Sequence, residues 1–127
     1  MKLLPLARLL RLPNVFTAFA DIALGLCATA ALSPATVDDT FGWKAALLVL
    51  ASGLLYMAGM VWNDYFDLAE DKRDRPFRPL PSGRVSVRAA VIIGLLLLAG
   101  GWACAAATGS ADRSAMSSAM RQNAYVA

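Results

Sequence analysis

Three long apolar runs constrain this chain more than any other feature. They cover residues 15–32, 43–62 and 87–107 in a sequence that is 58% hydrophobic. A transmembrane helix needs about 20 mainly apolar residues, and each run is close to that length. The second and third runs are apolar on every side, whereas a helix of a soluble protein is amphipathic. We therefore predict an all-α integral membrane protein with about three transmembrane helices.

The first run also has features of a signal peptide. Basic residues precede it, and the small residues 27–31 lie near its end. Asp21 in its middle and Pro13-Asn14 before it favour a transmembrane helix instead. An acid at that depth is expected to face protein rather than lipid.

The basic residues indicate an orientation in the membrane. Three of them lie before the first run, and six lie from Lys72 to Arg88. Residues 33–42 contain no base and carry Asp38 and Asp39. The positive-inside rule places the N-terminus and the segment before residue 87 in the cytoplasm, at the inner or plasma membrane if the protein is bacterial.

Several function classes are excluded by composition. The net charge is +3, but the bases alternate with acids at membrane edges, so they do not indicate nucleic acid as a partner. The chain has no histidine, which excludes His-based zinc sites and Ser-His triads. Cys27 and Cys104 both fall within apolar runs and are expected to be free.

One segment concentrates the ionisable residues. Residues 63–86, which read NDYFDLAEDKRDRPFRPLPSGRVS, separate the second apolar run from the third. The segment holds five acids and five bases: Asp64, Asp67, Glu70, Asp71, Asp74, Lys72, Arg73, Arg75, Arg78 and Arg84. Charge at a membrane boundary is costly, so this cluster is a candidate functional site.

The spacing of its acids predicts a cation site. At about 100° per residue, Asn63, Asp67 and Asp71 fall within roughly 80° of each other on a helix. If the helix continues through the segment, the remaining acids share this face, where like charges repel each other. Oxygen ligands without Cys or His favour Mg²⁺, Mn²⁺ or Ca²⁺. Arginines just downstream suit a phosphate bound to that ion.

The alternative is an interfacial loop whose acids and bases neutralise one another. The regular spacing of the acids favours the site. Pro76, Pro79 and Pro81 stop any helix, and Ser82-Gly83 supplies a turn. The segment therefore predicts a rigid loop that carries Arg78 and Arg84.

This combination resembles a known family. The pattern N-x-x-x-D-x-x-x-D followed by RPLPSG is similar to the first aspartate-rich motif and the next loop of the UbiA-type membrane prenyltransferases. The segment RLPNVFTAFAD, residues 11–21, resembles the beginning of the family's first helix. The resemblance covers roughly residues 8–107.

The resemblance implies an activity. Family members transfer a prenyl group from an isoprenyl diphosphate to a lipophilic, often aromatic, acceptor, with Mg²⁺ between the carboxylates and the diphosphate. By position, Asp67 and Asp71 are the catalytic residues and, with Asn63, the metal ligands. The implied substrate-binding residues are Asn63, Asp64, Arg78, Arg84, Arg11 and Asn14. Membrane lipid is the other expected partner.

The resemblance also implies a larger bundle with a second aspartate-rich motif, which this sequence lacks. We therefore expect residues 1–108 to be the N-terminal region of such a bundle, completed by an unknown chain if at all. Residues 109–127 are small and polar and predict a disordered tail. The alternative function is a non-catalytic membrane fragment or accessory subunit. A CDP-alcohol phosphotransferase is excluded, because the DG-x-x-AR pattern is missing.

Overall fold

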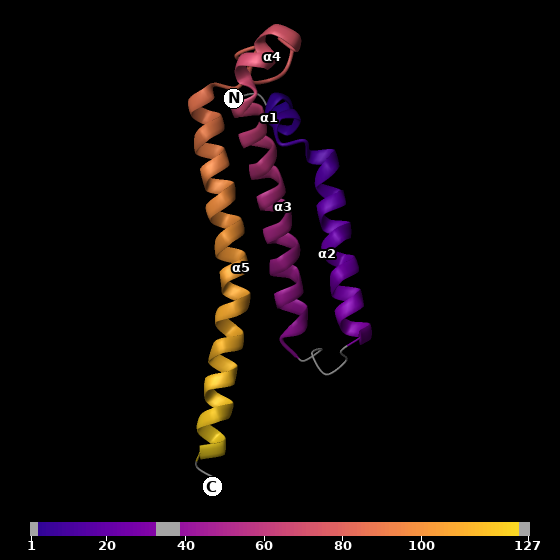
Figure 1. The fold of residues 1–127 in the computed structure, drawn as a ribbon, viewed down its shortest axis with the longest axis vertical. Coiled ribbons are helices and arrows are strands. Elements are labelled where there is room, and N and C mark those ends of the chain that lie inside the picture. The colour runs from indigo at the N-terminus through magenta and orange to yellow at the C-terminus, as the bar shows by residue number, and fades with distance from the viewer. Residues whose placement is uncertain (1–2, 33–38, 125–127) are drawn as a thin grey trace.

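The protein is a bundle of long helices, shown as a ribbon in Figure 1. The structure is a computed structural model that describes residues 3–32 and 39–124, with side chains described up to residue 109. It contains α1 (Leu3–Leu9), α2 (Leu12–Leu32), α3 (Phe41–Phe66), α4 (Leu68–Asp74) and α5 (Val87–Ala124). The described residues form no strand.

The three long helices lie side by side, with α3 in the middle. It packs against α2 on one side and against α5 on the other (Figure 1). The short helices α1 and α4 lie together at one end of the bundle, where α3 ends and α5 begins. This arrangement brings the N-terminal region and the charged segment to the same end.

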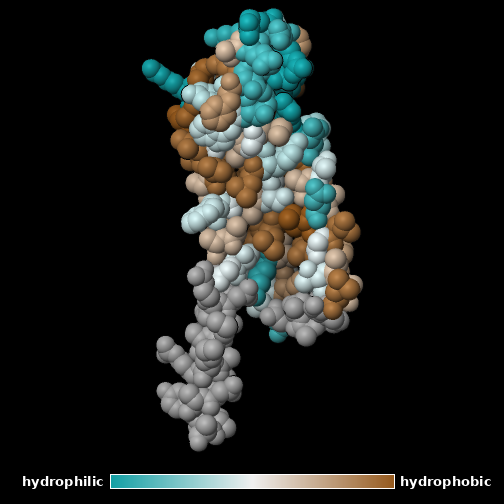
Figure 2. Space-filling model, in the orientation of Figure 1, coloured by the Kyte–Doolittle hydropathy of each residue, from teal (hydrophilic) through white to brown (hydrophobic). Residues whose placement is uncertain are grey.

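The long helices are suited to cross a membrane. Three helices are long and apolar enough to cross a membrane: Leu12–Leu32, Phe41–Phe66 and Val87–Gly109. They confirm the prediction of three such helices, and each is a few residues longer than the apolar run within it. Large apolar side chains lie exposed along them, among them Phe16, Leu24 and Trp102. Figure 2 shows hydrophilic residues gathered over the α4 end and hydrophobic ones along the helices below it. The chain is an all-helical integral membrane protein.

Small residues let the helices approach closely. A Cβ on Gly53 of α3 would lie 2.5 Å from the ring of Phe19 in α2. A Cβ on Gly101 of α5 would lie 2.7 Å from Cγ of Leu55 and 3.3 Å from the carbonyl oxygen of Ala51. Lipid tails are as apolar as the helices, so close packing of this kind holds membrane helices together.

The main apolar core lies at the charged end. It consists of Leu9, Val61, Leu80, Val85 and Ala90, all at most 3% exposed. These residues come from α1, from α3, from the loop between α4 and α5, and from α5 itself. The core therefore fixes four separate segments relative to one another directly beside the charged residues.

Two helix ends differ from the sequence-based expectation. The helix expected to run through residues 63–74 is interrupted at Asp67, whose ψ is 1° rather than the usual value of about −42°. The backbone bonds on both sides persist, from Asp67 N to the Asn63 carbonyl (3.0 Å) and from Asp71 N to the Asp67 carbonyl (2.8 Å). The interruption is thus a local change of direction between α3 and α4.

The second difference concerns the predicted disordered tail. The backbone of α5 continues as a helix to Ala124, whereas composition predicts a disordered tail over residues 109–127. Residues 125–127 lie outside the described part. Ala, Met, Arg and Gln are good helix formers, so a segment without large aliphatic residues can remain helical. The division of the chain at residue 108 stays a prediction.

Candidate functional site

Four charged side chains form a connected network at the α1–α4 end. Arg11 Nη2 donates to Asp64 Oδ1 at 3.2 Å, and Arg78 Nη1 lies 3.6 Å from the same oxygen. Arg78 Nη1 also donates to Asp71 Oδ2 at 2.6 Å. Asp64 and Asp71 are each 4% exposed. Buried carboxylates need partners, and here two guanidinium groups neutralise two acids.

Arg11 reaches Asp64 from the junction between α1 and α2. Its φ is +47°, the left-handed region that residues with a Cβ seldom adopt. Leu9 is fully buried just before it, and Asn14 N donates to the Arg11 carbonyl at 2.8 Å just after it. The strained backbone therefore turns the chain so that α1 packs on the core while Arg11 points to α3.

Arg78 is carried by an anchored loop. Pro79, Leu80 and Val85 are buried, and Val85 N donates to the Pro79 carbonyl at 3.1 Å. Gly83 has a φ of +72°, which confirms the predicted turn. The loop is therefore held at both ends of the turn, and α5 begins shortly after it.

The remaining motif residues lie nearer to solvent. Asn63 Nδ2 donates to Asp67 Oδ2 at 2.9 Å, and both side chains are exposed. Four of the five acids line a hollow of 150 Å³ together with Arg75: Asp67, Glu70, Asp71 and Asp74. Asp64 does not line this hollow. Its carboxylate lies with Arg11 and Arg78 instead.

The donor set fits a hard divalent cation in kind. Asn63, Asp67 and Asp71 offer only oxygen ligands, which Mg²⁺ prefers. In the hydrogen bonds described above, Asn63 donates through Nδ2, and Asp67 and Asp71 each accept through Oδ2. None of these bonds involves an Oδ1 atom. Within the described residues, no three Asp, Glu, Cys or His side chains are close enough to hold a metal ion. Arg78 occupies part of the coordinating capacity of Asp71.

Two predicted site residues lie apart from the network. Arg84 and Asn14 are both exposed, Arg84 on the loop and Asn14 in the first turn of α2. The pairing of Arg11 with Asp64 was not predicted, since 53 positions separate the two residues. The left-handed backbone at Arg11 could not be predicted from the sequence. Glycine or asparagine normally marks such a position, and here it is an arginine.

Aromatic side chains surround the end of α3. The ring of Trp62 lies 5.7 Å from that of Tyr65 and 6.0 Å from that of Phe66. Trp and Tyr concentrate where a membrane meets water. Their position beside the charged network is that of an interfacial belt.

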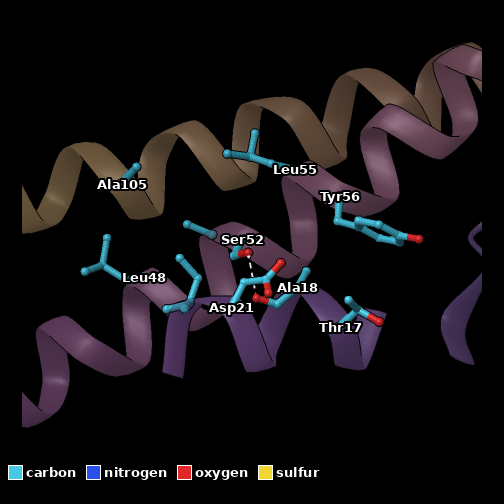
Figure 3. A pocket seen from close by; sticks show the side chains of 10 residues that line it. Thr17, Ala18, Asp21, Leu48, Ser52, Leu55, Tyr56 and Ala105 are labelled. Carbon is cyan, nitrogen blue, oxygen red and sulfur yellow. Dashed lines mark hydrogen bonds between the residues drawn. The ribbon is translucent and has the colours of Figure 1, made fainter. Parts of the chain in front are cut away.

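A second hollow lies farther along the bundle and is lined by residues of α2 and α3 and by Ala105 of α5 (Figure 3). It has a volume of 470 Å³, and its lining is mostly apolar. Asp21 lies in it beside Ser52, whose Oγ donates to the Ala18 carbonyl at 3.3 Å (Figure 3). Asp21, the one acid within the first span, thus lines this hollow, and it is exposed.

Comparison with known proteins identifies the family of the chain. The sequence profile of the UbiA prenyltransferase family matches residues 18–114. The chain belongs to the UbiA prenyltransferase family. The matched region includes the network residues Asp64, Asp71 and Arg78 and begins after Arg11 and Asn14. No solved structure matches the chain.

Several named proteins are similar to part of this chain. A digeranylgeranylglyceryl phosphate synthase from Methanosarcina mazei is 43% identical over 49% of this chain and 22% of the relative. The enzyme of the same name from Methanothrix thermoacetophila is 34% identical over 76% of the chain and 34% of the relative. The polyprenyl transferase esdpC from Penicillium shearii is 40% identical over 46% and 19%. The chain spans about a fifth to a third of the length of these relatives.

Proposed function

We propose that this chain supplies the isoprenyl diphosphate site of a Mg²⁺-dependent prenyltransferase, which transfers the prenyl group to a lipophilic acceptor. The observation that carries the proposal is the joining of two motif acids, Asp64 and Asp71, by an arginine of the RPLPSG loop. A diphosphate-binding site needs carboxylates for a cation and arginines for phosphate oxygens in one place. Membership of a prenyltransferase family supports this assignment.

Each residue then has a role. Asn63, Asp67 and Asp71 would hold the cation through oxygen atoms, and bound Mg²⁺ would neutralise charge that develops on the diphosphate leaving group. Arg78 would bind the diphosphate, with Arg84 able to approach from the same loop. Arg11 holds Asp64 in place, and Asn14, in the first turn of α2, would line the mouth of the site.

The prenyl chain and the acceptor belong on the membrane side of this site. The charged network lies at the end of α3, and apolar helix surfaces continue from it into the membrane-spanning region. The names of two relatives point to a prenylated glyceryl phosphate as one class of acceptor. The basic residues at this end favour a cytoplasmic location, where a water-soluble diphosphate is accessible.

Binding of a labelled prenyl diphosphate tests the proposal. The full chain in detergent micelles would be incubated with tritiated geranylgeranyl diphosphate, with and without Mg²⁺. We expect retention that requires Mg²⁺ and falls at least roughly tenfold in Asp67→Asn and in Asp71→Asn, because each loses a charged ligand. Asp39→Asn, which removes an acid from the opposite end of the bundle, serves as the matched control.

Retention that ignores Mg²⁺, or that survives both substitutions in a protein with normal helix content, would contradict the proposal. The chain would then be better described as a non-catalytic membrane segment or accessory subunit of this family.

A further inference from the structure

Arg78 holds two acids that otherwise would repel each other. Its Nη1 atom is 2.6 Å from Asp71 Oδ2 and 3.6 Å from Asp64 Oδ1. The acid side chains are 5% and 6% exposed, and that of Arg78 is 22% exposed. One guanidinium group therefore stands where a small cation would serve the same electrostatic purpose.

The backbone of Arg78 cannot easily leave this position. The next residues, Pro79 and Leu80, are buried, and Ser82 N donates to the Arg78 carbonyl at 3.0 Å. Arg78 N itself donates to the Arg75 carbonyl at 3.1 Å. A change of partner by Arg78 is therefore confined to its side chain.

Asp64 would keep a partner if Arg78 moved away. Arg11 Nη2 donates to the same Oδ1 atom at 3.2 Å. Asp71 has no such second arginine in the described part of the chain. Loss of Arg78 thus leaves Asp71, and not Asp64, in need of a positive charge.

We propose that Arg78 exchanges between two anions. It holds Asp71 while no cation is bound, and it binds the diphosphate when Asp71 holds a divalent cation instead of Arg78. This inference rests on the proposed function and adds an order to it, because cation and guanidinium compete for one carboxylate. A guanidinium released beside a bound cation is well placed for bidentate contact with phosphate oxygens. The exchange keeps every buried charge compensated in both states.

Cation binding in the absence of substrate tests the competition. Binding of Mn²⁺ to the full chain in detergent micelles would be followed by the electron paramagnetic resonance signal of free Mn²⁺. We expect Arg78→Gln to bind Mn²⁺ roughly tenfold more tightly than the parent, because a charge-assisted hydrogen bond no longer competes. Arg73→Gln removes the same charge from an exposed position of α4 and should change the affinity by about twofold or less.

Binding of inorganic pyrophosphate at saturating Mn²⁺ tests the second part of the proposal, which is the transfer of Arg78 to the diphosphate. We expect the parent to retain pyrophosphate and Arg78→Gln to bind it roughly tenfold more weakly. Arg78→Lys keeps the charge without the planar fork, so its Mn²⁺ affinity should stay near that of the parent while its pyrophosphate affinity falls. Circular dichroism would verify the helix content of each variant.

The possible failures are distinct. Equal or weaker Mn²⁺ binding by Arg78→Gln would overturn the competition, since Arg78 would then support Asp71 rather than block it. Unchanged pyrophosphate binding by that variant would overturn the transfer to diphosphate. Absence of Mn²⁺ binding in every variant would overturn this inference together with the cation part of the proposed function, whereas the first two results leave the proposed function standing.

Discussion

Asp64 is the residue on which the charged end depends most. It is buried at the end of a membrane-spanning helix and accepts contacts from arginines of two other segments, before α2 and after α4. A buried carboxylate without partners would be costly, so the acid and the arginines require each other. Asp64 therefore links three parts of the chain by charge, as the apolar core beside it does by packing.

Replacement of Asp64 should affect stability more than ligand binding. We expect Asp64→Asn to lower the free energy of unfolding by about 1–3 kcal/mol, because both arginines lose a charged acceptor. Unfolding in increasing SDS, followed by circular dichroism, would measure it. Asp67→Asn, at an exposed acid, should lower stability by about 0.5 kcal/mol or less and serves as the control. Equal effects of the two substitutions would contradict this role of Asp64.

The strained backbone at Arg11 makes an unusual prediction. Both Arg11→Gly and Arg11→Ala lose the bond to Asp64, but only glycine adopts a positive φ without strain. We expect the glycine variant to be more stable than the alanine variant by about 1 kcal/mol, the reverse of the order inside a helix. SDS unfolding midpoints of the two proteins would show it. An alanine variant of equal or greater stability would mean that residue 11 does not need the left-handed conformation.

At this scale the sequence predicts partners that are close along the chain and misses those that are far apart. The bond from Asn63 to Asp67 follows from helical spacing. The contacts of Asp64 with Arg11 and Arg78 depend on how α1 and the loop pack on α3, which spacing does not describe. The idea that acids and bases neutralise each other holds for Asp64 and Asp71, and the cation roles of Asn63, Asp67 and Asp71 stay predictions.

The contact between α3 and α5 depends on the absence of a side chain at one position. We expect Gly101→Ala to lower stability by about 1–3 kcal/mol, because its Cβ would overlap Leu55 and approach the backbone of α3. Gly59→Ala is the matched control, since nothing lies within 4 Å of a Cβ at that site. The SDS unfolding midpoint of each variant measures the effect. A Gly101→Ala protein as stable as the control would show that the two helices can separate slightly without loss.

The elements were predictable to different degrees. Apolar runs predict the three long helices well, because a membrane allows few other structures for them. The interruption at Asp67 and the short helix α1 were not predicted, since each depends on contacts around the core at the charged end. The continuation of α5 beyond residue 108 was not predicted, because small and polar residues were taken to indicate disorder.

For the whole molecule, the orientation in the membrane is the main prediction. We expect a cysteine at Ala69, exposed on α4, to react with an impermeant maleimide from the cytoplasmic side, and a cysteine at Gly42 to react from the other side. Cys27 and Cys104 would first be replaced by alanine. Labelling in right-side-out and inverted vesicles compares the two sites. The opposite pattern would place the proposed diphosphate site outside the cytoplasm and contradict the proposed access route.

The network of Arg11, Asp64, Arg78 and Asp71 has a consequence for the response to voltage. Two positive and two negative side chains sum to zero, so the group as a whole gains no energy when the membrane potential changes. A single uncompensated charge that crossed the whole field would gain or lose about 2.3 kcal/mol per 100 mV, and one at the edge of the membrane only a fraction of that. Loss of any one member leaves the network itself with a net charge, and we expect the energy of the network then to depend on the membrane potential.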